Sequence, residues 1–169
     1  MRREGTVLAW LALSLGAAAI AAAAEAQPSV APPPEAVLRD TRVADGFVME
    51  LVAAEPAVVD PVAVTFDEEG TPYVVEYRDY PQGPPTGSPP LSRVVRLLDD
   101  DGDGRYESST PVAERLPFSQ GVLAMRGGLL VTASPDVLLL SDSDGDGTLD
   151  RSETLATGFR VGKIGRAHV

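Results

Sequence analysis

The spacing of apolar residues between positions 42 and 162 predicts short β-strands and few helices. No window in this stretch keeps apolar residues at positions i, i+3, i+4 and i+7 over three turns, and Pro or Gly interrupts it repeatedly. Short apolar runs bounded by turn residues occur instead, and such runs are typical of strands. They cover residues 62–66, 73–77, 93–98, 111–113, 121–125, 129–133, 137–140 and 154–156.

These runs form two units of four strands that follow the same order. Asp99 and Asp142 open equivalent acidic turns 43 positions apart, and a Leu-Leu pair precedes each of them. A period of about 40–50 residues is typical of propeller blades. We therefore expect an all-β chain in which residues 42–163 form the first two four-stranded blades of an incomplete, truncated β-propeller. The first unit is longer because of a Pro- and Gly-rich insertion at residues 81–90, which we expect on a rim of the domain.

An eight-stranded β-sandwich is the alternative that the strand pattern leaves open. Repetition of the strands in register favours the propeller, because sandwich strands seldom repeat in this way.

The first 26 residues have the pattern of a secretory signal peptide. Arg2 and Arg3 precede an uncharged apolar run at residues 7–24, and small residues flank Glu25 as a signal peptidase requires. We expect residues 1–26 to be removed, residues 27–41 to be a Pro-rich linker, and the mature protein to be secreted or periplasmic. An uncleaved anchor is the alternative, and only through it would the protein associate with a membrane.

The last six residues, 164–169 (IGRAHV), resemble the translation of a sequencing-library adapter. We expect the native reading frame to be lost near Lys163; a natural disordered terminus is the alternative. His168, which is the single His of the sequence, lies in this tail and is not assigned a catalytic role, since it has no orienting partner there.

Charge and composition exclude several classes of function. The net charge of −11 repels phosphate backbones and anionic lipids, so we expect no nucleic-acid partner. The sequence has no Cys, which excludes disulfides, thiolate zinc sites, a Cys nucleophile and covalent attachment of a c-type haem.

The second acidic turn, residues 142–153, fits the twelve-position calcium loop. A tight turn assisted by Gly147 at position 6 can bring several oxygen ligands to one point, as calcium requires. The candidate ligands at positions 1, 3, 5, 7, 9 and 12 are Asp142, Asp144, Asp146, the carbonyl of Thr148, Asp150 and Glu153.

The first acidic turn, residues 99–110, fits the same pattern less completely, because Thr110 replaces the bidentate carboxylate at position 12. Its candidate ligands are Asp99, Asp101, Asp103, the carbonyl of Arg105 and Glu107. Neither turn has the flanking helices of an EF-hand, so we expect calcium to stabilise hairpins and not to drive a switch. Metal-free turns held by Asp side chains are the alternative, and magnesium is disfavoured because it retains waters.

Several ordered motifs resemble one bacterial family. They are the segments at residues 46–56, 59–63 and 76–81, the two Asp-Gly-Asp-Gly turns, and Leu116-Pro117-Phe118. Over residues 42–162 they resemble the start of large secreted proteins of the membrane-bound dehydrogenase family, whose N-terminal domain is a β-propeller similar to soluble glucose and sorbosone dehydrogenases.

The resemblance implies oxidation of a sugar or alcohol substrate, with electron transfer to pyrroloquinoline quinone or haem in the longer protein. No catalytic residue of that family maps onto this chain, so we expect the fragment itself not to be catalytic. A secreted, calcium-stabilised binding propeller and a free-standing calcium-binding module are the alternative functions. Arg78 and Asp79, before the Pro-rich insertion, are candidates for a functional surface, with a solvated ion pair as the alternative.

Overall fold

The computed structural model describes residues 32–80 and 83–159. The chain divides into Met1–Pro32 and Pro33–Val169, and the described part of the second unit contains every element below. The expected signal peptide, the linker residues before Pro32 and the tail at residues 164–169 lie outside the described residues.

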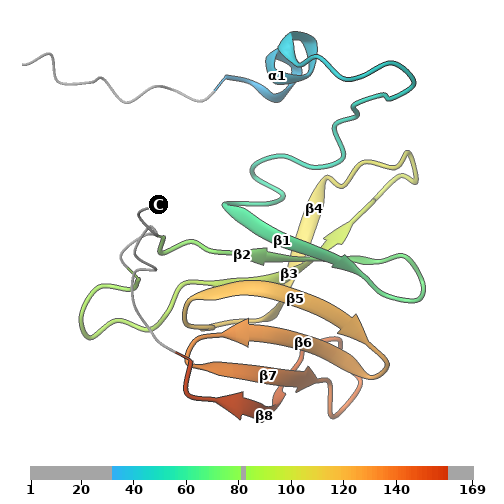
Figure 1. The fold of residues 1–169 in the computed structure, drawn as a ribbon. Coiled ribbons are helices and arrows are strands. Elements are labelled where there is room, and N and C mark those ends of the chain that lie inside the picture. Colours follow the sequence, from blue (N-terminus) through green and yellow to red (C-terminus); the bar gives the residue numbers. More distant parts are fainter. Residues whose placement is uncertain (1–31, 81–82, 160–169) are drawn as a thin grey trace, which may run out of the picture. The chain divides into compact units, whose positions relative to one another are not determined.

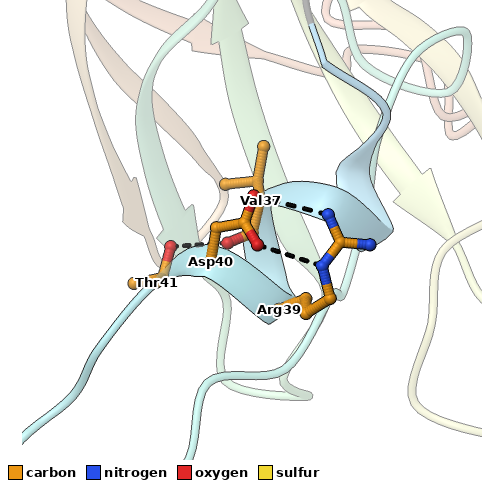
Figure 2. Close-up of polar contacts among 4 residues, drawn as sticks. All are labelled: Val37, Arg39, Asp40 and Thr41. Atoms are coloured by element: carbon orange, nitrogen blue, oxygen red, sulfur yellow. Dashed lines mark hydrogen bonds and ion pairs between the residues drawn. The ribbon is translucent and has the colours of Figure 1, made fainter.

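One helix precedes the strands, within the region expected as a linker. Helix α1, Pro34–Asp40, starts at a Pro, whose missing N–H costs nothing at that position. Thr41 ends it, because its hydroxyl donates to the carbonyl oxygen of Val37 at 2.6 Å. The exposed Arg39 side chain donates to Asp40 at 3.0 Å (Figure 2). No residue of α1 is buried, and Pro34, Ala36 and Leu38 are half-buried.

Eight strands form two antiparallel sheets in the described part of the chain (Figure 1). The first sheet has the order β1-β2-β3-β4 and the second β5-β6-β7-β8, so each is a meander of consecutive strands. Their bounds are β1 Pro61–Phe66, β2 Pro72–Glu76, β3 Arg93–Leu98, β4 Ser108–Ala113, β5 Ser119–Met125, β6 Gly128–Ala133, β7 Asp136–Ser141 and β8 Arg151–Thr157. The predicted all-β class, the eight strands and their division into two units of four are confirmed.

Irregularities in the strand pairing occur at matching positions in the two sheets. The pairing of β1 with β2 shifts between Pro61 and Ala63, and the pairing of β5 with β6 shifts between Ser119 and Gly121. The pairing between the last two strands of each sheet also shifts, at Val94/Val95 in the first sheet and at Val137/Leu138 in the second. Irregularities at matching positions indicate that the two sheets share one design, and such bulges increase the local twist of a sheet.

The main core lies between the two sheets. One apolar cluster unites buried residues of both, with Val75, Val94 and Val112 from the first and Val131 and Leu140 from the second. The backbone N–H of Ala124 on β5 also donates to the Thr65 hydroxyl on β1 at 3.1 Å. The sheets therefore pack on one another through a continuous core.

Strand β1 turns its smaller side chains toward that core. Ala63 packs against the cluster, whereas Val62, Val64 and Phe66 on the opposite face remain 49%, 57% and 57% exposed. Close packing against β5 admits a small residue here, so the larger ones lie on the outer face of the sheet.

The chain before β1 covers the rest of that outer face. Val58 packs with Val74, Val95 and Leu97 in a second apolar cluster, which Ala53 and Tyr106 extend. The central strands β2 and β3 are thus covered on both faces. Among the described residues, no helix is long and apolar enough to cross a bilayer.

Candidate metal centre

Both acidic loops lie at the same end of the sheets. The first joins β3 to β4 and the second joins β7 to β8, so in antiparallel meanders they share an end with the β1–β2 and β5–β6 turns. Those two turns are neighbours, because Phe66 and Glu68 of the first line one hollow with Met125 and Gly127 of the second. We call this end the acidic end.

The first Asp of each loop closes the turn in the same way. Asp99 accepts the backbone N–H groups of Gly102 and Gly104 at 2.6 and 3.0 Å. Asp142 accepts those of Gly145 and Gly147 at 2.7 and 2.8 Å. These four glycines have φ between 80° and 89°, a left-handed conformation that side chains disfavour.

The next carboxylates continue the turn stepwise. Asp101 accepts the N–H of Asp103 at 3.2 Å, and Asp103 accepts that of Arg105 at 2.8 Å. The second loop has the same two bonds: Asp144 accepts the N–H of Asp146 at 3.2 Å, and Asp146 accepts that of Thr148 at 2.7 Å.

The carboxylate at position 9 ties the end of each loop to its start. Glu107 accepts the N–H of Asp100 at 3.1 Å. Asp150 accepts the N–H and the hydroxyl of Ser143 at 2.9 and 2.7 Å. Carboxylates in both loops therefore accept hydrogen bonds from their own backbone, which is the geometry that the metal-free alternative describes.

Hydrogen bonds keep three of these carboxyls acidic. The N–H groups of Gly104 and Gly147 are the largest causes that lower the pKa of Asp99 and Asp142, respectively. The Ser143 hydroxyl is the largest cause that lowers the pKa of Asp150. Each bond favours the charged form of the carboxyl that accepts it.

The structure brings together only part of each predicted ligand set. Oxygens of Asp99, Asp101 and Glu107 lie within 4.8 Å of one another, as do those of Asp142, Asp144 and Asp146. Asp103 and the carboxylates of Asp150 and Glu153 are outside these two groups. Glu153 lies on the exposed strand β8, opposite Leu139, and Thr110 lies on β4, opposite Arg96. Both groups consist of carboxylate oxygens alone, so they do not test the predicted carbonyl ligands of Arg105 and Thr148.

The residues present fit calcium better than other metals. Each group offers three carboxylates that are exposed or half-exposed, and calcium accepts oxygen ligands at variable geometry. Among the residues that the structure describes, no His or Cys joins either group, so neither offers the nitrogen and sulfur ligands typical of zinc.

Sequence reasoning missed two residues that connect the loops to neighbouring elements. Tyr106 and Leu149 occupy position 8 of the two loops, and each donates its N–H to a carbonyl oxygen outside its own sheet: that of Val52 for Tyr106 and that of Val112 for Leu149, both at 2.7 Å. Apolar character at position 8 is the only signal in the sequence, and it does not identify a partner.

The opposite end of the first sheet holds the other candidate residues. Asp79 is buried, and it accepts the Ser92 hydroxyl at 2.6 Å and the Leu91 N–H at 3.2 Å. It is therefore not part of a solvated ion pair, whereas Arg78 is exposed.

Comparison with curated proteins and with solved structures gave no match. Comparison with family models gave one, which covers both sheets, both acidic loops and the helix. The chain belongs to the family described as domain of unknown function (DUF7133), because the model of that family matches residues 33–167.

Proposed function

We propose that the two sheets are consecutive blades of a β-propeller, and that the chain is a secreted, calcium-stabilised propeller module. The meander order of both sheets supports this proposal, because a propeller blade is a four-stranded meander. An immunoglobulin-like sandwich instead exchanges strands between its sheets through Greek-key connections.

One repeated hydrogen bond carries the proposal. Leu149, in the second loop, donates to Val112 of β4, which is the outermost strand of the first sheet. Tyr106, at the same position of the first loop, donates to Val52 at the same distance. Val52 therefore accepts a hydrogen bond from the acidic loop of the first sheet, just as Val112 of β4 accepts one from the acidic loop of the second sheet. The chain around Val52 has the place of an outermost strand of a preceding blade.

The exposed apolar faces agree with a continuing array of blades. Val62, Val64 and Phe66 lie exposed on β1, facing away from the second sheet. Leu123 and Met125 lie 54% and 48% exposed on β5. Both strands are first in their meanders, where successive blades pack most closely around a propeller axis. Each face fits a further blade.

Calcium would act in this arrangement by fixing the turn that holds each position-8 N–H. A bound cation would offset the repulsion among three carboxylates in each loop. Because the N–H at position 8 reaches a different sheet or segment, a more rigid loop also stabilises the contact between blades.

Calcium titration of the whole chain tests this function. We expect calorimetry to detect calcium binding and the melting temperature to rise with calcium and fall with EGTA, since a ligand that binds only the folded state stabilises it. Asp142→Asn and Asp99→Asn should each remove one site. Glu68→Gln, an exposed acid of the β1–β2 turn outside both groups, is the matched control and should bind as the native chain does. An identical melt in calcium and in EGTA would disprove the calcium role.

The oxidation of a sugar or alcohol stays a prediction that rests on the sequence resemblance. Covalent haem needs two Cys and a His, and the sequence has no Cys, so these residues do not fit that group. No redox step is derived for pyrroloquinoline quinone, because no residue here is assigned to it.

A further inference from the structure

A hollow of about 550 Å³ lies at the end of the first sheet opposite the acidic loops. Arg78 after β2, Arg93 at the start of β3 and Arg115 after β4 all line it. Three Arg residues from three separate parts of the chain therefore line one hollow, in a protein whose net charge is −11.

Two buried carboxylates accept hydrogen bonds from residues that line this hollow. Glu76 is completely buried, and it accepts the Arg93 Nε–H at 2.5 Å and the Val59 N–H at 2.8 Å. Asp79, also buried, accepts bonds from Leu91 and Ser92. Burial of a carboxylate is costly unless it is paired or hydrogen-bonded, and here both bond the segment that lines the hollow.

Two other lining residues have uncommon backbone conformations. Asp60 and Arg115 have φ of 48° and 59°, and only three residues other than Gly have positive φ in the described chain. Such conformations persist where the surrounding structure holds them, and they concentrate at binding sites. Tyr77 contributes to this restraint, since its N–H donates to the Asp60 carbonyl at 3.0 Å.

The polar groups of the lining differ in their partners. Arg93 is paired with Glu76, whereas Arg78 and Arg115 have no side-chain hydrogen bond or ion pair within residues 32–80 and 83–159. Asp60 and Glu114 are exposed acceptors in the same hollow. Val59, Pro89 and Pro90 complete the lining with apolar surface.

We propose that this hollow binds a hydroxylated carboxylate, that is, a sugar acid. The planar guanidinium groups of Arg78 and Arg115 match a carboxylate, with which Arg forms paired, charge-assisted bonds. Asp60 and Glu114 accept hydrogen bonds from hydroxyl groups, and they disfavour a ligand that carries negative charge over its whole surface. The apolar lining packs against the C–H face of the sugar ring. The site lies at the other end of the sheet from the acidic loops, so it does not depend on calcium.

Titration of the whole chain with D-galacturonate, D-galactose and inorganic phosphate tests the site. Calorimetry and amide NMR shifts measure the binding. We expect galacturonate to bind. Galactose lacks the carboxylate, so we expect its affinity to be lower by a factor of about ten or more. Arg78→Gln and Arg115→Gln should each weaken galacturonate binding about tenfold. Arg126→Gln, which removes an Arg from the acidic end, is the matched control and should leave the affinity unchanged.

Each other result overturns the proposal. Equal binding of galactose would show that the carboxylate is not recognised. Phosphate binding as tight as that of galacturonate would show a general anion site without a role for the hydroxyl acceptors. Absence of galacturonate binding by a chain whose NMR spectrum is that of a folded protein would show that no such site exists. Because calcium binding is measured separately, the two proposals can fail independently.

Discussion

The carboxylate of Glu76 is completely buried, and it accepts the Arg93 Nε–H at 2.5 Å across the β2–β3 pair. This pair lies in the same antiparallel register that joins Val75 to Val94 beside it. Side chains alternate along a strand, so Glu76 and Arg93 lie on the face of the sheet that carries Val74 and Val95. The ion pair therefore connects the second apolar cluster to the hollow at the sheet end.

Removing one partner of this pair should cost more stability than removing both. Arg93→Met leaves a buried carboxylate without its cation, and we expect a loss of about 3 kcal/mol in the free energy of unfolding. The double change Glu76→Met with Arg93→Met should cost less, because no charge is left buried. Urea unfolding of the two variants measures the difference. A smaller loss in Arg93→Met than in the double variant would contradict the interpretation.

The bond from Leu149 to Val112 should be visible in solution as slow amide exchange. We expect the amides of Tyr106 and Leu149 both to exchange slowly, although each lies in an otherwise exposed loop, because each donates to a separate element. Amide hydrogen exchange measured by NMR tests this, with the exposed turn residue Glu68 as a fast-exchanging reference. Fast exchange at Leu149 in a folded sample would remove the main support for consecutive blades.

Acid should destabilise the metal-free protein through the loop carboxyls. Hydrogen bonds to Gly104 and Gly147 lower the pKa of Asp99 and Asp142 in the folded state. A lowered pKa gives stability that is complete above the unfolded pKa of about 3.9 and is lost as the pH falls through the folded value.

Thermal melts of protein freed of calcium beforehand, in calcium-free buffers from about pH 6 down to about pH 3, measure this loss. Asp142→Asn should show a weaker dependence on pH, since it has one such carboxyl fewer. Glu68→Gln should keep the native dependence. A melting temperature that does not change over this range would refute the role of these bonds.

A side chain at position 128 should disrupt the second sheet. A Cβ atom added to Gly128 would lie 2.0 Å from the Leu140 carbonyl oxygen, so the paired strands would have to separate. We expect Gly128→Ala to lower the free energy of unfolding by about 1–3 kcal/mol.

Gly121→Ala is the matched comparison for Gly128→Ala. Its added Cβ would lie 3.0 Å from the Thr132 hydroxyl, which belongs to a side chain that can rotate. Urea unfolding should therefore show a smaller loss for Gly121→Ala, and the reverse order would show that the close approach at Gly128 is not restrictive.

Alternation and turn residues in the sequence are enough to predict the eight strands without any tertiary contact. Strand β3 has the predicted bounds, and the others differ from prediction by one to three residues at an end. The prediction succeeded because each strand is short and turn residues bound it, so local steric preferences decide where pairing stops. The positions of the acidic loops followed from the same spacing, since an Asp-Gly turn closes through bonds within a few residues.

Only the tertiary structure decided which faces and which ends become functional. Alternation placed Val62, Val64 and Phe66 on one face of β1, but their exposure depends on how closely β1 packs on β5. The burial of Asp79 and the gathering of Arg78, Arg93 and Arg115 around one hollow depend on segments that are apart in sequence. Local residue patterns fix backbone conformation over a few positions, whereas a site built from distant segments exists only once the sheets have packed.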